Sequence, residues 1–216
     1  MAEDIRNMAS TAGKKEFEKK YTKPYCVVLD SEYCSMGRMI GMIACQQTGY
    51  AYYDAMILLE ESPKSGITLE EVEAFEERYR KREYSKEELV TDPEYQKIDA
   101  AFDQAIDAAL AKGPCLIHDR AVKEMIEAKG YSCISVLTYA DNMQAKIERA
   151  KLSPLYKDLP SEEIPAKIQE EDNIRINYHK AHSHTAWGDK QTYDLLINAE
   201  TFGRDEAAAI LSAVMK

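Results

Sequence analysis

The stretch that decides the fold begins with Tyr25-Cys26-Val27-Val28-Leu29-Asp30 and continues through Ser31 to Gly41. The first six residues are a short apolar run with β-branched members, which is typical of a strand buried on both faces of a sheet. A loop that contains Gly37 follows, and the residues from Arg38 to Thr48 have helical spacing. The sequence therefore predicts a buried strand, a loop and a helix in direct succession.

This succession of strand and helix returns later in the chain. Three further apolar runs are expected to be strands, at 115–118, 132–139 and 193–198. Alternating strands and helices predict an α/β fold with a parallel sheet and helices on both of its faces. Three helices are expected after these strands. The first ends near Ala128, the second runs from Asp141 to about Lys151, and the third runs from Asp205 to Met215.

The composition is that of an ordinary globular protein. The chain has 216 residues, of which 45% are hydrophobic and 31% are charged, with a formal net charge of -10. This excludes the collagen-like, disordered and disulfide-scaffold classes, and the length favours one α/β domain with an inserted subdomain. An acidic chain lacks the positive field that non-specific nucleic-acid binding requires. No nucleic acid is expected as a partner, whereas anionic small molecules remain compatible with local arginines.

The sequence also indicates where the protein works. Its five cysteines are odd in number and none stands in a C-x-x-C pair, which is typical of reduced intracellular thiols. Met1 is followed by polar residues with no apolar run before a cleavage site, and no stretch approaches the roughly 18 apolar residues of a membrane span. We expect a cytoplasmic protein without a membrane partner. The oligomeric state stays open, with a homodimer as one option.

Two long charged segments interrupt the alternation of strands and helices. Residues 60–110 hold helical patterns, and residues 152–189 hold another. Loops beyond the carboxyl ends of parallel strands surround the binding crevice of such sheets, so these insertions either cover a site or pad the sheet. We divide the chain into an N-terminal extension, 1–22, and one domain, 23–216, whose insertions span about 60–112 and about 152–190.

The loop from Ser31 to Gly37 is the first candidate site. Backbone N–H groups in such a turn, together with the positive end of the following helix dipole, form an anion site. A phosphate loop reads G-x-x-x-x-G-K-[ST], and only Gly37 and the basic residue Arg38 match it. The spacing alone leaves two interpretations open, a phosphate site and a plain strand-to-helix connection with an exposed arginine.

Four motifs in order resemble those of the cytidylate kinase-like proteins, a branch of the P-loop nucleoside monophosphate kinases. That family reads S-R-E-x-G-S-G-G-R-x-I-G in the first loop, G-R in the middle, and D-x-x-R-x-x-Y-Y in a lid that precedes W-G-D and Y-D-L-x-I-N. The resemblance covers the chain from about Tyr25 to the C-terminus. The corresponding segments are Ser31 to Gly41, Gly113 to Ala121, Tyr139-Ala140 and Asp172 to Asn198.

The resemblance implies a three-layer P-loop kinase fold, in which a parallel sheet flanked by helices carries a helical acceptor-binding insertion and a helical lid. It implies phosphoryl transfer from ATP, with Mg²⁺, to a nucleoside monophosphate, by default of the cytidylate type. Such transfer needs in-line positioning and positive charge around the moving oxygens, which arginines supply. The implied catalytic residues are Arg38, Arg149 and Arg175; the ATP and phosphate-binding residues are Ser31, Glu32, Tyr33, Cys34, Ser35, Met36, Gly37 and Arg38; the acceptor-binding residues are Arg120, Asp54 and Gln104; and the lid residues are Asp172, Arg175 and Tyr178.

The chain departs from the family pattern at positions close to the expected phosphates. Cys34 and Met36 replace glycines, and a side chain at such a glycine forces strain or narrows the space. Two alternatives therefore stay open: a catalytically inactive nucleotide-binding or regulatory relative, and a kinase of another small molecule. The other departures are Ser31 for an arginine, Asp119 for a glycine, Ala145 for an arginine, Asn173 and Ile174 for basic residues, and Met39 where a phosphate loop carries Ser or Thr.

Some of these residues also have ordinary structural interpretations. Asp119 and Arg120 would form a simple ion pair at the start of a helix, and Arg149 would pair along its own helix or with solvent. Trp187, the only tryptophan, is expected to bury its ring on the adenine side, together with the segment 193–198.

The second insertion contains His179, His182 and His184 in the pattern H-x-x-H-x-H. Nearby imidazoles can converge on zinc, which makes a metal site conceivable. No cysteine or further histidine stands close by to complete the ligand set. We therefore expect no metal and interpret the three histidines as a solvated face of the lid.

Overall fold

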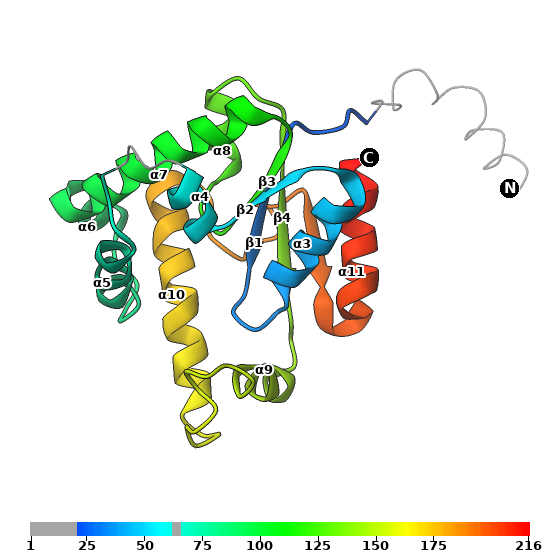
Figure 1. Ribbon diagram of the computed structural model, residues 1–216. Coiled ribbons are helices and arrows are strands. Elements are labelled where there is room, and N and C mark those ends of the chain that lie inside the picture. The colour runs from blue at the N-terminus through cyan, green and yellow to red at the C-terminus, as the bar shows by residue number, and fades with distance from the viewer. Residues whose placement is uncertain (1–20, 62–65) are drawn as a thin grey trace, which may run out of the picture.

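The computed structural model describes residues 21–61 and 66–216, and its centre is a five-stranded parallel sheet. The strands lie in the order β2-β3-β1-β4-β5, and every neighbouring pair is parallel (Figure 1). This confirms the predicted α/β class. The strands are β1 (Cys26–Ser31), β2 (Ala51–Tyr53), β3 (Cys115–His118), β4 (Cys133–Tyr139) and β5 (Leu195–Asn198).

The central strand β1 is buried along its whole length, as its unbroken apolar run predicts. Successive side chains of a strand point to opposite faces, so β1 contributes to two hydrophobic cores. Val27 and Leu29 belong to the core that α3 (Gly37–Thr48) and α11 (Ala199–Met215) cover. Cys26 and Val28 belong to the core on the other face. Figure 1 shows α3 and α11 together on one side of the sheet.

The opposite face is covered by the helices that the first insertion contributes, together with two later ones. Each insertion helix begins at a side chain that caps it: Thr68 and Glu71 form a capping box on α5, Ser85 and Glu88 form another on α6, and Asp92 caps α7 ahead of Pro93. Local sequence thus sets where these helices start. The helices on this face are α4 (Ala55–Glu61), α5 (Leu69–Tyr79), α6 (Lys86–Thr91), α7 (Pro93–Lys112), α8 (Lys123–Ala128) and the C-terminal part of α10 (Ile164–His182).

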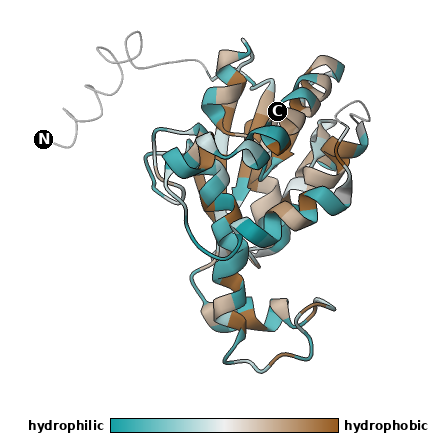
Figure 2. Ribbon diagram, turned by 90° about the vertical axis from the view of Figure 1, so that its left-hand side faces the viewer, coloured by the Kyte–Doolittle hydropathy of each residue, from teal (hydrophilic) through white to brown (hydrophobic). Residues whose placement is uncertain are grey.

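A smaller unit projects beyond the edge of the sheet, formed by α9 (Met143–Ala150), the segment 151–163 and the start of α10 (Figure 1). Its own hydrophobic cluster includes Ile147, Tyr156 and Ile164, and Tyr33 and Cys34 of the loop after β1 pack against it. Figure 2 shows hydrophobic residues, in brown, among the helices of this projecting unit. The loop after β1 is therefore in contact with the segment expected to be a lid.

Three details of the sequence prediction need correction. The strand β2 was not foreseen, because Ala51-Tyr52-Tyr53 is only three residues long. A short helical segment that begins at Ala199 precedes the expected last helix, and Gly203, with φ 76° and ψ 172°, separates the two parts of α11. The last strand begins at Leu195 rather than Tyr193.

Most of the expected N-terminal extension, 1–22, lies outside the described residues. Of the helices in the part of the chain that the structure describes, none combines the length and the apolar character that crossing a membrane requires.

Candidate functional site

A cavity of about 220 Å³ opens at the carboxyl ends of β2 and β3, beside the first turn of α3. The carboxyl ends of parallel strands meet at one edge of a sheet, so residues that directly follow different strands come together there. Three arginines and four carboxylates dominate the lining. They are Arg38, Arg120 and Arg175, with Asp54, Glu76, Asp119 and Glu171.

Arg38 reaches the cavity from the start of α3. Its Nη2 lies 3.0 Å from Oδ2 of Asp54, which follows β2 directly, while 60% of the Arg38 side chain is exposed. Asp54 also accepts a hydrogen bond from the backbone N–H of Ile57, which fixes the carboxylate at the start of α4. Arg38 is thus held at the cavity mouth and stays accessible to a ligand.

Arg120 is buried, and its guanidinium pairs with Glu76 of α5 through Nη2. It also lies 5.3 Å from the ring of Phe102 and 5.8 Å from that of Tyr178. Burial lowers the pKa of Arg120 to about 10, because the charged form loses water. The ion pair considered between Asp119 and Arg120 is wrong, since Arg120 pairs with Glu76 instead.

Arg175 enters the cavity from α10. Its Nε donates to Oδ2 of Asp119 at 2.8 Å, its Nη1 donates to the carbonyl of Glu171 at 2.8 Å, and its guanidinium lies 5.6 Å from the ring of Tyr33. The neighbouring carboxylates, Asp119 first, raise the pKa of Arg175 despite the opposing effect of burial. The guanidinium therefore stays charged next to the loop.

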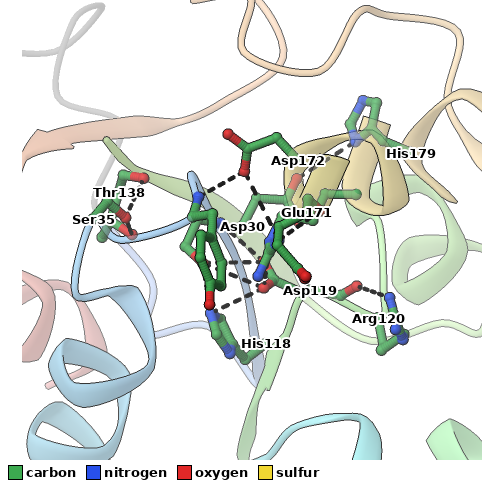
Figure 3. A network of polar contacts seen from close by, with 12 residues as sticks. Asp30, Ser35, His118, Asp119, Arg120, Thr138, Glu171, Asp172 and His179 are labelled. Atoms are coloured by element: carbon green, nitrogen blue, oxygen red, sulfur yellow. Dashed lines mark hydrogen bonds and ion pairs between the residues drawn. The ribbon is translucent and has the colours of Figure 1, made fainter. Parts of the chain in front are cut away.

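Asp119 connects the turn after β3 with the loop after β1 (Figure 3). Its Oδ1 accepts the backbone N–H of Ser31 at 3.0 Å, and its φ of 59° lies in the left-handed region, where the family carries glycine. Beside it, Nε2 of His118 lies 2.9 Å from Ser31 Oγ, and Nδ1 lies 3.1 Å from the hydroxyl of Tyr52. Burial lowers the pKa of His118, so this imidazole is neutral.

The loop itself keeps a strained backbone at two positions. Cys34 has φ 64° and Met36 has φ 66°, a region that favours glycine. The Met36 side chain packs against the core under α3 and that of Cys34 against the cluster around Ile147, so neither side chain lines the cavity. Met36 provides no side-chain cap, which leaves the first turn of α3 without that acceptor. Two residues with side chains thus take a backbone conformation that ordinarily favours glycine.

The remaining loop residues make structural contacts. Ser35 is buried and donates its hydroxyl to the carbonyl of Thr138 at 3.0 Å. Oε2 of Glu32 accepts from Nζ of Lys146 at 2.6 Å and from the backbone N–H of Ala140 at 3.1 Å. A Cβ on Gly37 would lie 2.3 Å from Cβ of Ser31, so only glycine fits where the loop passes this close to β1.

Lys146 was not foreseen as a site residue. It is a buried cation of α9, one position after Ala145. Its ammonium forms an ion pair with Glu32, which belongs to the loop after β1, and does not line the cavity. The sequence could have indicated Lys146, because it is a basic residue on the expected helix after the strand at 132–139.

Of the expected site residues, four line the cavity: Arg38, Asp54, Arg120 and Arg175. The loop from Ser31 to Gly37, Asp172, Tyr178, Arg149 and Gln104 do not. Nε of Arg149 donates to the carbonyl of Cys34 at 2.7 Å, and its Nη2 pairs with Glu200 at 2.9 Å, so it supports the loop from the side of α9 and α11. Gln104 lies exposed on α7 and is not part of the cavity lining. The assignment of Gln104 to an acceptor base stays a prediction that this cavity does not support.

The lid residues Asp172 and Tyr178 are both buried in α10. Oδ1 of Asp172 accepts the backbone N–H of Tyr33 at 2.6 Å, and burial raises the pKa of Asp172 to about 6. The hydroxyl of Tyr178 donates to the carbonyl of Arg120 at 2.9 Å. Both residues link α10 to segments that border the cavity.

The interpretation of the three histidines as a solvated lid face is wrong for two of them. His179 is buried, with Nδ1 3.5 Å from Oδ2 of Asp30, and His182 Nε2 lies 2.8 Å from Oδ1 of Asp99. Only His184 is exposed. Trp187, expected to be buried, is half-buried.

Met39 cannot serve as the magnesium ligand that a phosphate loop supplies at its position. Mg²⁺ prefers hard oxygen ligands, and the thioether of Met39, half exposed in the first turn of α3, is not one. Within residues 21–61 and 66–216, no three His, Cys, Asp or Glu side chains form a group that could hold a metal ion.

A comparison with known families decides the relationship of the chain. The sequence model described as "cytidylate kinase-like family" matches residues 26–201. The chain belongs to the cytidylate kinase-like family. This membership agrees with the order of the four motifs along the chain. None of the curated proteins matches it.

Solved structures share the fold of this cytidylate kinase-like chain. An uncharacterized protein from Eubacterium ventriosum is 17% identical, with a TM-score of 0.65, over 88% of this chain and 97% of that one. A shikimate kinase from Bacteroides thetaiotaomicron is 10% identical, with a TM-score of 0.51, over 88% of this chain and 97% of that one. At these identities the likeness concerns the fold alone.

Proposed function

We propose that the chain transfers a phosphoryl group from ATP to a nucleoside monophosphate, with a cytidylate as the first candidate acceptor. The observation that carries this proposal is the position of Arg38, Arg120 and Arg175 around one cavity at the carboxyl edge of the sheet. Guanidinium groups bind phosphate oxygens through paired hydrogen bonds and stabilise the charge of the transferred group. Family membership supports the same reaction class.

The three arginines have different tasks in this proposal. Arg38 and Arg175 neutralise the transferred group, because they flank the loop that receives the donor phosphates. Arg120 holds the acceptor phosphate, since it is the most deeply buried of the three and lies next to aromatic side chains that suit a base. Binding exchanges each present carboxylate partner for a phosphate, so the arginines stay paired throughout.

The lid and the metal complete the proposal. α10 carries Arg175 to the loop and excludes water from the transferred group. The phosphates of the nucleotide would hold Mg²⁺, which would offset their charge, and no step here depends on a protein ligand to it. All the residues named come from one chain, so the reaction does not require the homodimer considered from the sequence.

An assay of ADP release tests the proposed reaction. The full chain is given ATP, Mg²⁺ and each common nucleoside monophosphate in turn, and turnover is expected with cytidine monophosphate. Arg120→Ala should lower kcat/KM for the acceptor by about 100-fold, the usual cost of one lost contact of this kind. Arg204→Ala, a control on an exposed arginine that pairs with Asp205, should leave turnover unchanged. Absence of turnover with every acceptor would contradict the proposal.

A second candidate function is nucleotide binding without catalysis. Cys34 and Met36 in left-handed backbone geometry, and Met39 in place of a hydroxyl side chain, favour this alternative. It predicts that ATP stabilises the protein while no acceptor is phosphorylated. A kinase of another small molecule, left open by the sequence, would instead show turnover only when non-nucleotide acceptors are added to the panel.

A further inference from the structure

Two carboxylates lie between the loop after β1 and Arg175. The backbone N–H of Ser31 donates to Oδ1 of Asp119 at 3.0 Å, and that of Tyr33 donates to Oδ1 of Asp172 at 2.6 Å. Asp119 Oδ2 accepts from Nε of Arg175 at 2.8 Å, and Asp172 Oδ1 lies 3.8 Å from Nη1 of the same guanidinium. Figure 3 shows both carboxylates within one network of polar contacts.

These are the contacts that a bound phosphate would make. Phosphate oxygens at a strand-to-helix loop accept backbone N–H groups and pair with a nearby guanidinium. A carboxylate oxygen uses the same donors, and it brings a negative charge that repels a second anion at the same place. An incoming phosphate group and the two carboxylates therefore compete for Arg175 and for the N–H groups of Ser31 and Tyr33.

The two carboxylates differ in how they are held. Asp119 sits in the turn after β3 and is fixed to the sheet. Asp172 is on α10, which is also bound to the insertion, because Asn173 donates to the carbonyl of Arg80 at 2.9 Å and Asn177 to that of Tyr79 at 2.8 Å. Asp172 can lose its contact with the N–H of Tyr33 in two ways, by a rotation of its own side chain or by a movement of α10.

We propose that Asp172, assisted by Asp119, is an internal anion that holds α10 against the loop and competes with the phosphates of a polyphosphate ligand. The inference rests on the proposed function for the nature of the ligand, but it does not require phosphoryl transfer. A ligand binds when Asp172 gives up the N–H of Tyr33 and the charge of Arg175. Burial, which makes the ionised form of Asp172 costly, favours this release because the carboxylate regains water.

Titration calorimetry at neutral pH tests this competition with inorganic tripolyphosphate and with ATP as probes. Asp172→Asn keeps an oxygen for the N–H of Tyr33 and removes the negative charge. The dissociation constants of both probes should fall by about tenfold, which corresponds to about 1.4 kcal/mol. Glu170→Gln is the matched control: it removes the same charge from the same helix, where Glu170 pairs with Lys167 at 2.8 Å, and affinity should not change.

Asp119→Asn provides an independent variant in case Asp172→Asn does not fold, and it should also tighten binding of both probes. Affinity in both variants equal to or weaker than that of the unmodified chain overturns the inference, as does an absence of binding in every variant. Tighter binding without any turnover supports the inference and contradicts the proposed reaction. Turnover with unchanged affinity in both variants supports the proposed reaction and contradicts the inference.

Discussion

Asn177 of α10 accepts a hydrogen bond from the backbone N–H of Tyr84 at 2.8 Å, which ties the lid helix to the segment between α5 and α6. The same amide donates to the carbonyls of Tyr79 and Arg82, at 2.8 and 2.9 Å. Asn177 is almost fully buried and its bond to the carbonyl of Tyr79 is buried, whereas its bonds to Tyr84 and Arg82 are half-buried. Through Asn177, α10 is therefore connected to the segment between α5 and α6.

Asn177→Ala should lower the free energy of unfolding by about 2 kcal/mol, because it removes three hydrogen bonds and leaves the buried carbonyl of Tyr79 without a partner. Urea denaturation followed by circular dichroism measures this. Gln144→Ala, a control on an exposed amide that bonds only Glu148, should change stability by less than about 0.5 kcal/mol. Equal effects of the two substitutions would contradict the structural role of Asn177.

Gly37→Ala should be more damaging than Gly41→Ala. A Cβ at Gly37 would lie 2.3 Å from Cβ of Ser31 and 2.6 Å from Oγ1 of Thr138, both on the rigid β1 and β4. At Gly41 the nearest atom, at 2.9 Å, is the end of the flexible Leu29 side chain. We expect a loss of at least about 2 kcal/mol at Gly37 and a smaller loss at Gly41, measured by thermal denaturation. The reverse order would show that the loop is packed differently.

Asp172 should make the stability of the protein depend on pH. Burial raises its pKa from 3.8 to about 6, so between these values the native state binds more protons at this carboxyl than the unfolded chain does. Its contribution to the free energy of unfolding is therefore present at low pH and is lost as pH rises toward about 6 and above. Relative to the unmodified chain, Asp172→Asn should gain about 1 to 3 kcal/mol between about pH 4 and pH 7. A constant difference across this range, seen in urea titrations, would contradict the raised pKa.

Arg149 should affect catalysis through the loop and not through the cavity. It supports the carbonyl of Cys34 with Nε and pairs with Glu200, so its loss displaces the loop without removing a charge from the cavity lining. We expect Arg149→Ala to lower kcat/KM by about tenfold, against about 100-fold for Arg175→Ala. Steady-state kinetics of the two variants decides this, and a larger loss for Arg149→Ala would place that residue in the reaction itself.

Much of the fold followed from local patterns. The apolar run of β1 and the strand β4 were evident because buried parallel strands are continuous apolar segments. The strand β2 was missed because three residues carry no periodicity, and only its pairing with β3 makes it a strand. The short helical segment before Gly203 was missed, because the expected helix began only at Asp205.

The site was predicted less completely, because its contacts join distant segments. Arg38, Arg120 and Arg175 were found from their motifs, and they do lie around one cavity. Their partners were not foreseen, since no local pattern reports that Glu76 reaches Arg120 from α5. The burial of His179 was missed for a related reason. Between Glu171 and His182, α10 buries residues on several sides, including polar ones that bind other backbone segments, so periodicity does not separate a buried face from an exposed one there.

The central claim is that the loop and its arginines receive the phosphates of ATP, and the melting temperature with and without ATP and Mg²⁺ tests it most directly. ATP at about 100 times its dissociation constant should stabilise the protein by about 2.7 kcal/mol, a clear rise in melting temperature. Arg38→Ala should lose this rise, whereas the control Arg204→Ala should keep it. A melting temperature that ATP leaves unchanged, or an equal rise in Arg38→Ala, would contradict the account.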